Sequence, residues 1–260
     1  MRTALSALFC LLVVVSTTPA QRPAPQQPAA PLDPDHNPLD NVLLRWEDSM
    51  KRIESLQAQV EEVKEDAVLK RRDAWDGVAK YIKPNMASLD LRRRDNPDAF
   101  RKYICTGTYF YEYNQSKQEI RVNELPPPKP GQVADDNFLS FIFGMKAAEA
   151  KRRYTLRLLP EDQNFFYIEV LPRFQEDRED FQKAYLALTK DKFMPRAVRY
   201  VEPNGNTITW NIPAIDIGAR LDRNEFTQPR LPAGWKFYMV PPREAAPAGT
   251  PQPRVFRSNQ

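Results

Sequence analysis

The sequence predicts an α+β protein with about nine to eleven strands, mostly in antiparallel pairs, and two principal helices. Apolar residues recur at helical spacing over 39–53, and a second helix is expected over 136–152, where acidic residues precede and basic residues end an apolar segment. The segments between and after them have strand-like alternation or β-type content. Short turns such as Asn204-Gly205 separate the strands, and short turns favour antiparallel neighbours. With 42% hydrophobic residues, the 260-residue chain can bury one good core.

The two ends of the chain differ in composition from the middle. Arg2 precedes an apolar run over 4–15 and small residues up to Ala20, a pattern typical of a secretory signal peptide spanning 1–20. The run is shorter than the roughly 20 residues of a membrane span, and a retained signal acting as an anchor is the alternative. Prolines cluster in 21–38 and 241–260, which predicts a disordered linker and a disordered tail around a domain at 39–240. We expect an exported protein of the periplasm or cell envelope.

The residue inventory argues against enzymatic chemistry. The one histidine, His36, lies in the Pro-rich linker, so the domain lacks the base of a Ser–His or Cys–His pair and a histidine ligand for zinc. Cys105 has no recognisable partner base. The acidic pairs at 161–162 and 176–177 are expected at exposed turns, and no Gly-rich phosphate loop is present. We expect a protein without catalytic residues, cofactor or metal.

Charge restricts the partners. The formal net charge is +4, with basic clusters at 70–72, 92–94 and 151–153. These clusters are typical of solvated faces or helix ends, and an anionic membrane surface is the alternative partner. Nucleic acid is not expected for an exported protein, and we expect a monomer.

The first half of the domain begins with a helix. Asn37 can cap it, Pro38 suits its first position, and apolar residues from Leu39 to Ile53 form one stripe. After Ser55 the period changes to that of a strand, and strands are expected at 56–61, 75–82 and 86–91.

The segment "CTGTYFYEYNQSKQEIRV" predicts a meander of three short strands. On its middle strand, Tyr109, Tyr111 and Tyr113 share one face, while Phe110 and Glu112 point to the other. A second helix is expected at 136–152. It is apolar on more than one side, so other parts of the protein must cover most of its surface. Strands are expected at 154–159, 165–171, 184–189, 197–202 and 207–212, with a last segment ending near Val240.

The motifs "SLQAQV", "GVAKYIKPN", "TGTYFYEYNQSKQEI", "NFLSFIFGM" and "RLPAGWKF", in this order, carry a resemblance. Over 39–240 the chain resembles the periplasmic outer-membrane lipoprotein carrier family, LolA, as a divergent secreted branch. The resemblance implies an unclosed antiparallel β half-barrel with helices covering its open concave face around a hydrophobic cavity for acyl chains. The family's arginine before Pro-Asn, which ties the lid to the barrel, corresponds to Lys83, which keeps the charge but loses the planar fork.

On such a concave face the three tyrosines would line the cavity. The lid would be the helix carrying Phe138, Phe141, Ile142 and Met145, with Lys83 as its latch. A tightly packed inner face is one alternative for the tyrosines, and stacking on sugars or bases is another. Shielding an acyl chain of ~16 carbons is worth on the order of 12 kcal/mol, at about 0.8 kcal/mol per CH₂. The sequence therefore predicts a carrier or sensor that binds acyl chains of lipid or lipoprotein, the alternative being a ligand-free scaffold module tethered in the envelope.

Overall fold

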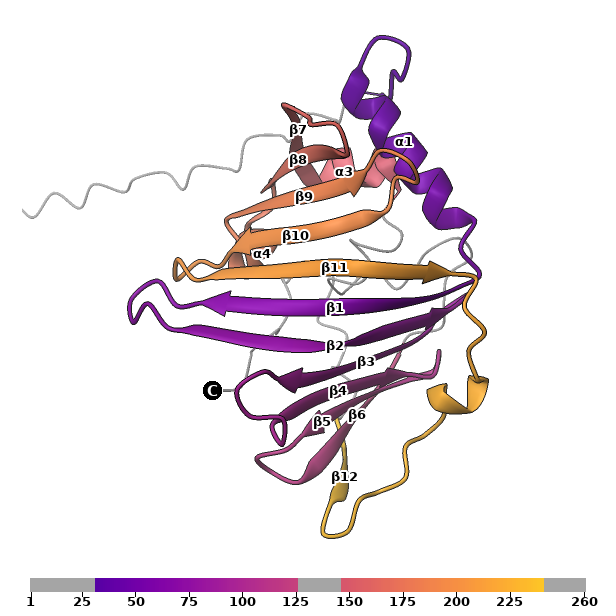
Figure 1. Ribbon diagram of the computed structural model, residues 1–260, viewed down its shortest axis with the longest axis vertical. Coiled ribbons are helices and arrows are strands. Elements are labelled where there is room, and N and C mark those ends of the chain that lie inside the picture. Colours follow the sequence, from indigo (N-terminus) through magenta and orange to yellow (C-terminus); the bar gives the residue numbers. More distant parts are fainter. Residues whose placement is uncertain (1–30, 126–145, 241–260) are drawn as a thin grey trace, which may run out of the picture.

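The computed structural model describes residues 31–125 and 146–240 (Figure 1). Within these ranges twelve strands form one sheet in the order β12-β6-β5-β4-β3-β2-β1-β11-β10-β9-β8-β7. Neighbouring strands are antiparallel except for β12 and β6, which are parallel. The expected fold class is confirmed. The sheet has one strand more than the upper expectation because the last segment contributes β12.

The strand bounds follow the predicted segments closely. They are β1 (Ser55–Glu65), β2 (Arg72–Ile82), β3 (Met86–Arg93), β4 (Phe100–Cys105), β5 (Tyr109–Asn114), β6 (Glu119–Glu124), β7 (Tyr154–Leu159), β8 (Phe165–Pro172), β9 (Lys183–Thr189), β10 (Pro195–Val201), β11 (Thr207–Ile217) and β12 (Lys236–Met239). Two meanders, β1–β6 and β7–β11, are joined where β1 pairs with β11.

Helix α1 (Pro38–Lys51) is the expected first helix. The side chain of Asn37 accepts a hydrogen bond from the Leu39 amide at 3.0 Å, and Pro38 opens the first turn, so the predicted cap is confirmed. The buried stripe carries Val42, Leu43, Trp46 and Met50. Two shorter helices, α3 (Ala147–Arg153) and α4 (Gln175–Asp180), and a 3₁₀ turn, η1 (Arg223–Phe226), complete the described elements.

Pairing across the strands defines two faces of the sheet, because directly opposed residues point to the same side. The row of Ala58, Ala79 and Leu89 belongs to the main core together with α1. We call this side the inner face. The neighbouring row of Gln57, Lys80 and Ser88 points the other way and marks the outer face. Helix α1 contacts α3, and both contact β7; Figure 1 shows them together at this end of the sheet.

The segment after β11, a strand in the middle of the sheet, runs past β1–β5 to the edge of the sheet formed by β6 (Figure 1). Phe226 of η1 is fully buried, and Glu225 forms an ion pair with Lys80 on the outer face. The segment ends as β12 beside β6.

The second predicted helix is described only at its end, as α3. Phe138, Phe141, Ile142 and Met145, the expected lid residues, lie outside the described residues. Among the helices that are described, none has both the length and the apolar character needed to cross a membrane.

Candidate ligand-binding face

The sequence-predicted latch, Lys83, lies just beyond the end of β2. Its Nζ donates to the carbonyl oxygen of Lys51, the last residue of α1, at 3.0 Å. The same ammonium contacts Glu54 Oε1 at 2.8 Å. Lysine thus joins the end of a strand to the end of α1 without the two-pronged geometry of arginine. Its role as a latch in ligand loading stays a prediction.

The structure corrects the placement of Tyr109, Tyr111 and Tyr113. Tyr111 pairs with Ile104, and Ile104 pairs with Ser88 of the outer row. The tyrosines therefore lie on the outer face, opposite α1. Trp235 and Phe237, from the C-terminal segment, pack over them in a second, smaller apolar cluster.

The geometry of that cluster explains its stability. The ring of Tyr113 lies 5.8 Å from Trp235 between centroids, and Tyr111 meets Phe237 edge-on at 6.4 Å. Burial raises the pKa of Tyr111, which keeps its phenol neutral. The three tyrosines hold the C-terminal segment against the outer face of the sheet and do not lie on the face that α1 covers.

The residues that alternate with the tyrosines occupy the inner face. Phe110 stacks on Tyr103 with centroids 5.9 Å apart and planes 17° apart. Leu89, opposite Tyr103, and Tyr81 are half-buried and pack against the main core. Burial raises the pKa of Tyr103. This surface on β2–β5 is mainly apolar and aromatic and faces the same side as α1, with Glu112 of β5 lying opposite Tyr103.

A charged pair interrupts this apolar face. Glu62 of β1 is buried, with a side chain 5% exposed, and Arg101 of β4 reaches it with Nη1, which donates to both carboxylate oxygens at 2.9 Å. The guanidinium lies 3.9 Å from the centre of the Trp75 ring. Glu62 stands between Trp75 and Trp210, its partners in the neighbouring strands.

Tyr200 of β10 lies close enough to Glu62, Arg101 and Trp210 for each of them to affect its pKa. Burial, together with the nearby carboxylates of Glu62 and Glu202, raises the pKa of Tyr200. A hydrogen bond with Trp210 and the charge of Arg101 act in the opposite direction without cancelling the rise. Sequence reasoning missed Glu62 and Arg101. The available signal was that Glu62 continues the apolar row of Leu56, Ala58 and Val60 at strand spacing.

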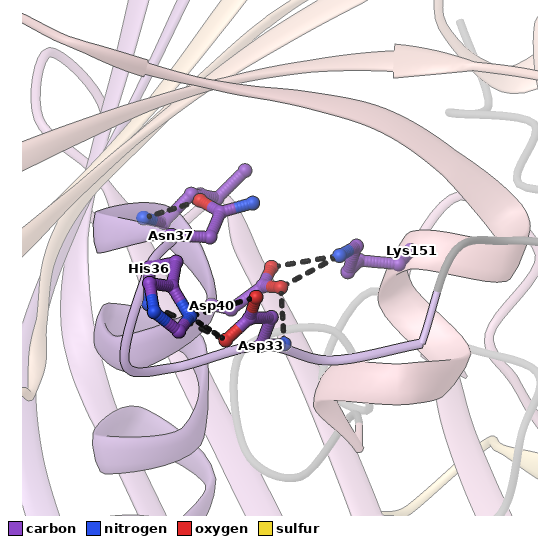
Figure 2. Close-up of polar contacts among 6 residues, drawn as sticks. Asp33, His36, Asn37, Asp40 and Lys151 are labelled. Carbon is purple, nitrogen blue, oxygen red and sulfur yellow. Dashed lines mark hydrogen bonds and ion pairs between the residues drawn. The ribbon is translucent and has the colours of Figure 1, made fainter.

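Helices α1 and α3 are fastened by a buried ion pair (Figure 2). Lys151 Nζ lies 2.8 Å from both carboxylate oxygens of Asp40, and Asp40 also accepts a hydrogen bond from the Asp33 amide at 2.9 Å. At the other end of α3, Glu47 accepts from the Ala147 amide at 2.7 Å. Both ends of α3 are therefore attached to α1.

Glu47 is also electrostatically distinctive. Burial acts to raise its pKa, but hydrogen bonds from Lys51 and the Ala147 amide outweigh it and hold the pKa of Glu47 below its ordinary value. The carboxylate therefore stays ionised at the start of α3, where the helix dipole also favours negative charge.

The sequence led us to expect the acidic pair at 176–177 at an exposed turn, but both residues belong to helix α4. Asp177 lies in α4 and is buried, and Arg153 Nε donates to both of its carboxylate oxygens at 2.9 Å. The basic cluster at 151–153 is a helix end, as expected, but two of its three side chains pair with buried aspartates. The pattern of charges along the sequence does not reveal this, because each partner lies on another element.

Neither a metal centre nor an activated thiol is found in the described part. Over residues 31–125 and 146–240, no three side chains from His, Cys, Asp and Glu gather as a metal site. Burial raises the pKa of the Cys105 thiol, which donates to the Asn85 carbonyl oxygen at 3.0 Å. A protonated, hydrogen-bonded thiol is a poor nucleophile.

Comparison with known proteins shows similarity in structure alone. No protein-family model matches the chain, and no curated protein matches it. An uncharacterized conserved protein from Thermus thermophilus aligns at a TM-score of 0.50 with 10% identity, covering 78% of this chain and all of that one. A putative outer membrane lipoprotein-sorting protein domain from Vibrio parahaemolyticus aligns at 0.39 with 12% identity, covering 72% and 97%. A LolA superfamily protein from Nitrosomonas europaea aligns at 0.37 with 13% identity, again covering 72% and 97%.

At such low identity, the similarity to the Thermus protein supports the fold and nothing more. The open, almost wholly antiparallel sheet with helices on one face has the unclosed half-barrel architecture that was expected from the sequence.

Proposed function

We propose that this protein is an exported, non-enzymatic binder of the acyl chains of a lipid or lipoprotein, acting as a carrier or sensor in the cell envelope. The observation that carries the proposal is the half-buried apolar row on the inner face of β2–β5, with Leu89, Tyr103 and Phe110. It lies on the same face as α1, while α1 and α3 have their main contacts at the β7 end.

The energetics fit this use of the surface. A 16-carbon chain gains on the order of 12 kcal/mol when it leaves water completely. Aromatic and aliphatic side chains that are already half-buried lose little conformational freedom when a tail packs on them. This free energy is large enough to hold an acyl chain, even if part of it is spent on displacing side chains that cover the surface when no ligand is bound.

The remaining sequence predictions complete the proposal. Residues 1–20 would direct export, and 21–38 and 241–260 would be a linker and a tail around the domain at 39–240. Phe138, Phe141, Ile142 and Met145 would cover the bound tail as a lid. Lys83, which holds the end of α1, would influence how readily that cover opens.

Leu89 and its neighbour Ser88 provide a matched test, because they are adjacent on β3 and point to opposite faces. The full chain with Leu89→Asp should lose binding of a fluorescent fatty acid at least tenfold, while Ser88→Asp should bind as the natural protein does. Native mass spectrometry of each purified protein should show co-purified lipid only in the natural chain and the Ser88 variant. Equal binding by all three proteins would refute the proposal.

A second pair separates loss of the site from loss of folding. Leu89→Trp adds volume without charge and should also block the tail, whereas Ser88→Trp should not. Thermal unfolding of each variant, followed by circular dichroism, identifies any that has lost its fold. If folded Leu89→Trp binds the fatty acid undiminished, the tail does not lie on this part of the inner face.

A further inference from the structure

The buried pair of Glu62 and Arg101 on the inner face carries a desolvation cost that apolar side chains in the same place would avoid. Taking a carboxylate and a guanidinium out of water is costly, and apolar residues of similar volume often stabilise a protein as well or better. On the inner face, Val60 comes two residues before Glu62 on β1 and Leu91 lies opposite Arg101, while the next charged pair on this face is Arg93 with Asp73. A charged pair in such a surface is what a site for a polar ligand group requires.

Arg101 has N–H groups that its contacts with Glu62 do not use. Both contacts to Glu62 use Nη1. Neither Nε nor Nη2 donates to any residue in 31–125 or 146–240. The Arg101 side chain is 30% exposed, against 5% for Glu62, so the guanidinium is the accessible half of the pair. The indole Nε1 of Trp75, under the guanidinium, is also buried with no acceptor among the described residues.

These donors adjoin the proposed path of the tail. Arg101 pairs with Leu91, and Leu91 pairs with Gly77 on the same inner row. Tyr103 is the next inner-face residue on β4, and Phe110 stacks on it. A tail on the aromatic row would therefore have its polar end within reach of the guanidinium.

We propose that Arg101, held in place by Glu62 and Trp75, binds the anionic head of the acyl ligand, a carboxylate or a phosphate. This rests on the proposed function. Arginine can donate two parallel hydrogen bonds to such an oxyanion. Glu62 aims the guanidinium and also competes with the incoming anion for its charge. The two residues therefore affect binding in opposite directions.

The test uses ligands with one tail and different heads. Palmitate and 1-hexadecanol compare a carboxylate with a neutral head, and palmitoyl lysophosphatidic acid with monopalmitin compares a phosphate with a neutral head. In the full chain, Arg101→Gln should weaken the anionic ligands about tenfold, as expected for loss of a charge-assisted hydrogen bond, and leave the neutral ones unchanged. Glu62→Gln should tighten the anionic ligands. Arg92→Gln, on the outer face of β3, is the charge-matched control and should change neither.

The outcomes distinguish this inference from the proposed function. If no tail binds, the proposed function fails. If all four ligands bind equally and Arg101→Gln weakens none, tail binding stands and the head-group site is overturned. If both substitutions weaken all ligands equally and lower the unfolding temperature, the pair is a structural ion pair only. Inorganic phosphate should not compete at millimolar concentration, and full competition would mean a site for the free ion.

Discussion

The buried ion pair between Asp40 of α1 and Lys151 of α3 gives the clearest prediction about stability. Asp40 is 1% exposed and Lys151 15% exposed, so the pair is shielded from solvent. Removing one partner of a buried pair typically costs about 3–5 kcal/mol, because the other charge is left uncompensated. Lys151→Met leaves the fully buried carboxylate and should cost that much. Asp40→Asn leaves a lysine that still reaches water and should cost less, about 2 kcal/mol.

A double-mutant cycle tests the reasoning. Asp40→Asn combined with Lys151→Met removes both charges, so its loss should fall short of the sum of the single losses by about 1–3 kcal/mol. The free energy of unfolding is measured by urea titration followed by circular dichroism. Arg152→Met, on the same helix with a side chain 71% exposed, is the control and should change little. A Lys151→Met variant that behaves like the control, or losses that simply add, would show that the two charges do not stabilise each other.

Three further predictions concern other parts of the chain. A methyl group at Gly77 would lie 2.0 Å from the carbonyl oxygen of Asp90, so Gly77→Ala should destabilise the protein by more than about 3 kcal/mol, and an unchanged unfolding temperature would contradict this contact. Trp235→Ala should cost about 1–3 kcal/mol of stability and leave fatty-acid affinity unchanged, because Trp235 packs on the outer face; a parallel loss of affinity would place the tail there instead. The pKa of Glu47 is lowered from 4.5, so its contribution to stability is present above that pH and disappears as pH falls through the lower, folded value. Urea titrations should show the gap between the natural chain and Glu47→Gln closing in acid, and a constant gap would contradict the assignment.

Much of the fold could be predicted from the sequence because its signals are local. The cap at Asn37, the change of period after Ser55 and the Asn204-Gly205 turn each depend on neighbouring residues, and each marks an element boundary in the structure. The register of the meanders follows from short connections between strands that pair with their neighbours in sequence.

The site was harder to predict, because which face of a strand lies inside is decided by distant segments. The alternation of residues correctly placed Tyr111 and Phe110 on opposite faces of the sheet. The local sequence does not indicate which of these faces is the one that α1 covers. The answer depends on Trp235, which follows β5 by more than a hundred residues and covers the tyrosines. Asp177 and Arg153 likewise look like solvent-exposed charges in sequence, and only the fold brings Arg153 at the end of α3 beside the buried Asp177 of α4.

The most direct test of the central claim locates a bound tail relative to the two faces. Trp75 lies on the inner face and Trp235 on the outer one. Two variants of the full chain are needed, each keeping one of these tryptophans and carrying phenylalanine at the other tryptophan positions. A fatty acid brominated in the part of its chain nearest the carboxylate quenches indole fluorescence only at contact distance.

Acyl binding on the inner face predicts strong quenching in the variant that keeps Trp75 and unchanged emission in the one that keeps Trp235. An excess of unbrominated fatty acid should reverse the quenching. Equal quenching of both variants, quenching of Trp235 alone, or none in either folded variant would contradict the claim that the inner face of this half-barrel holds an acyl chain.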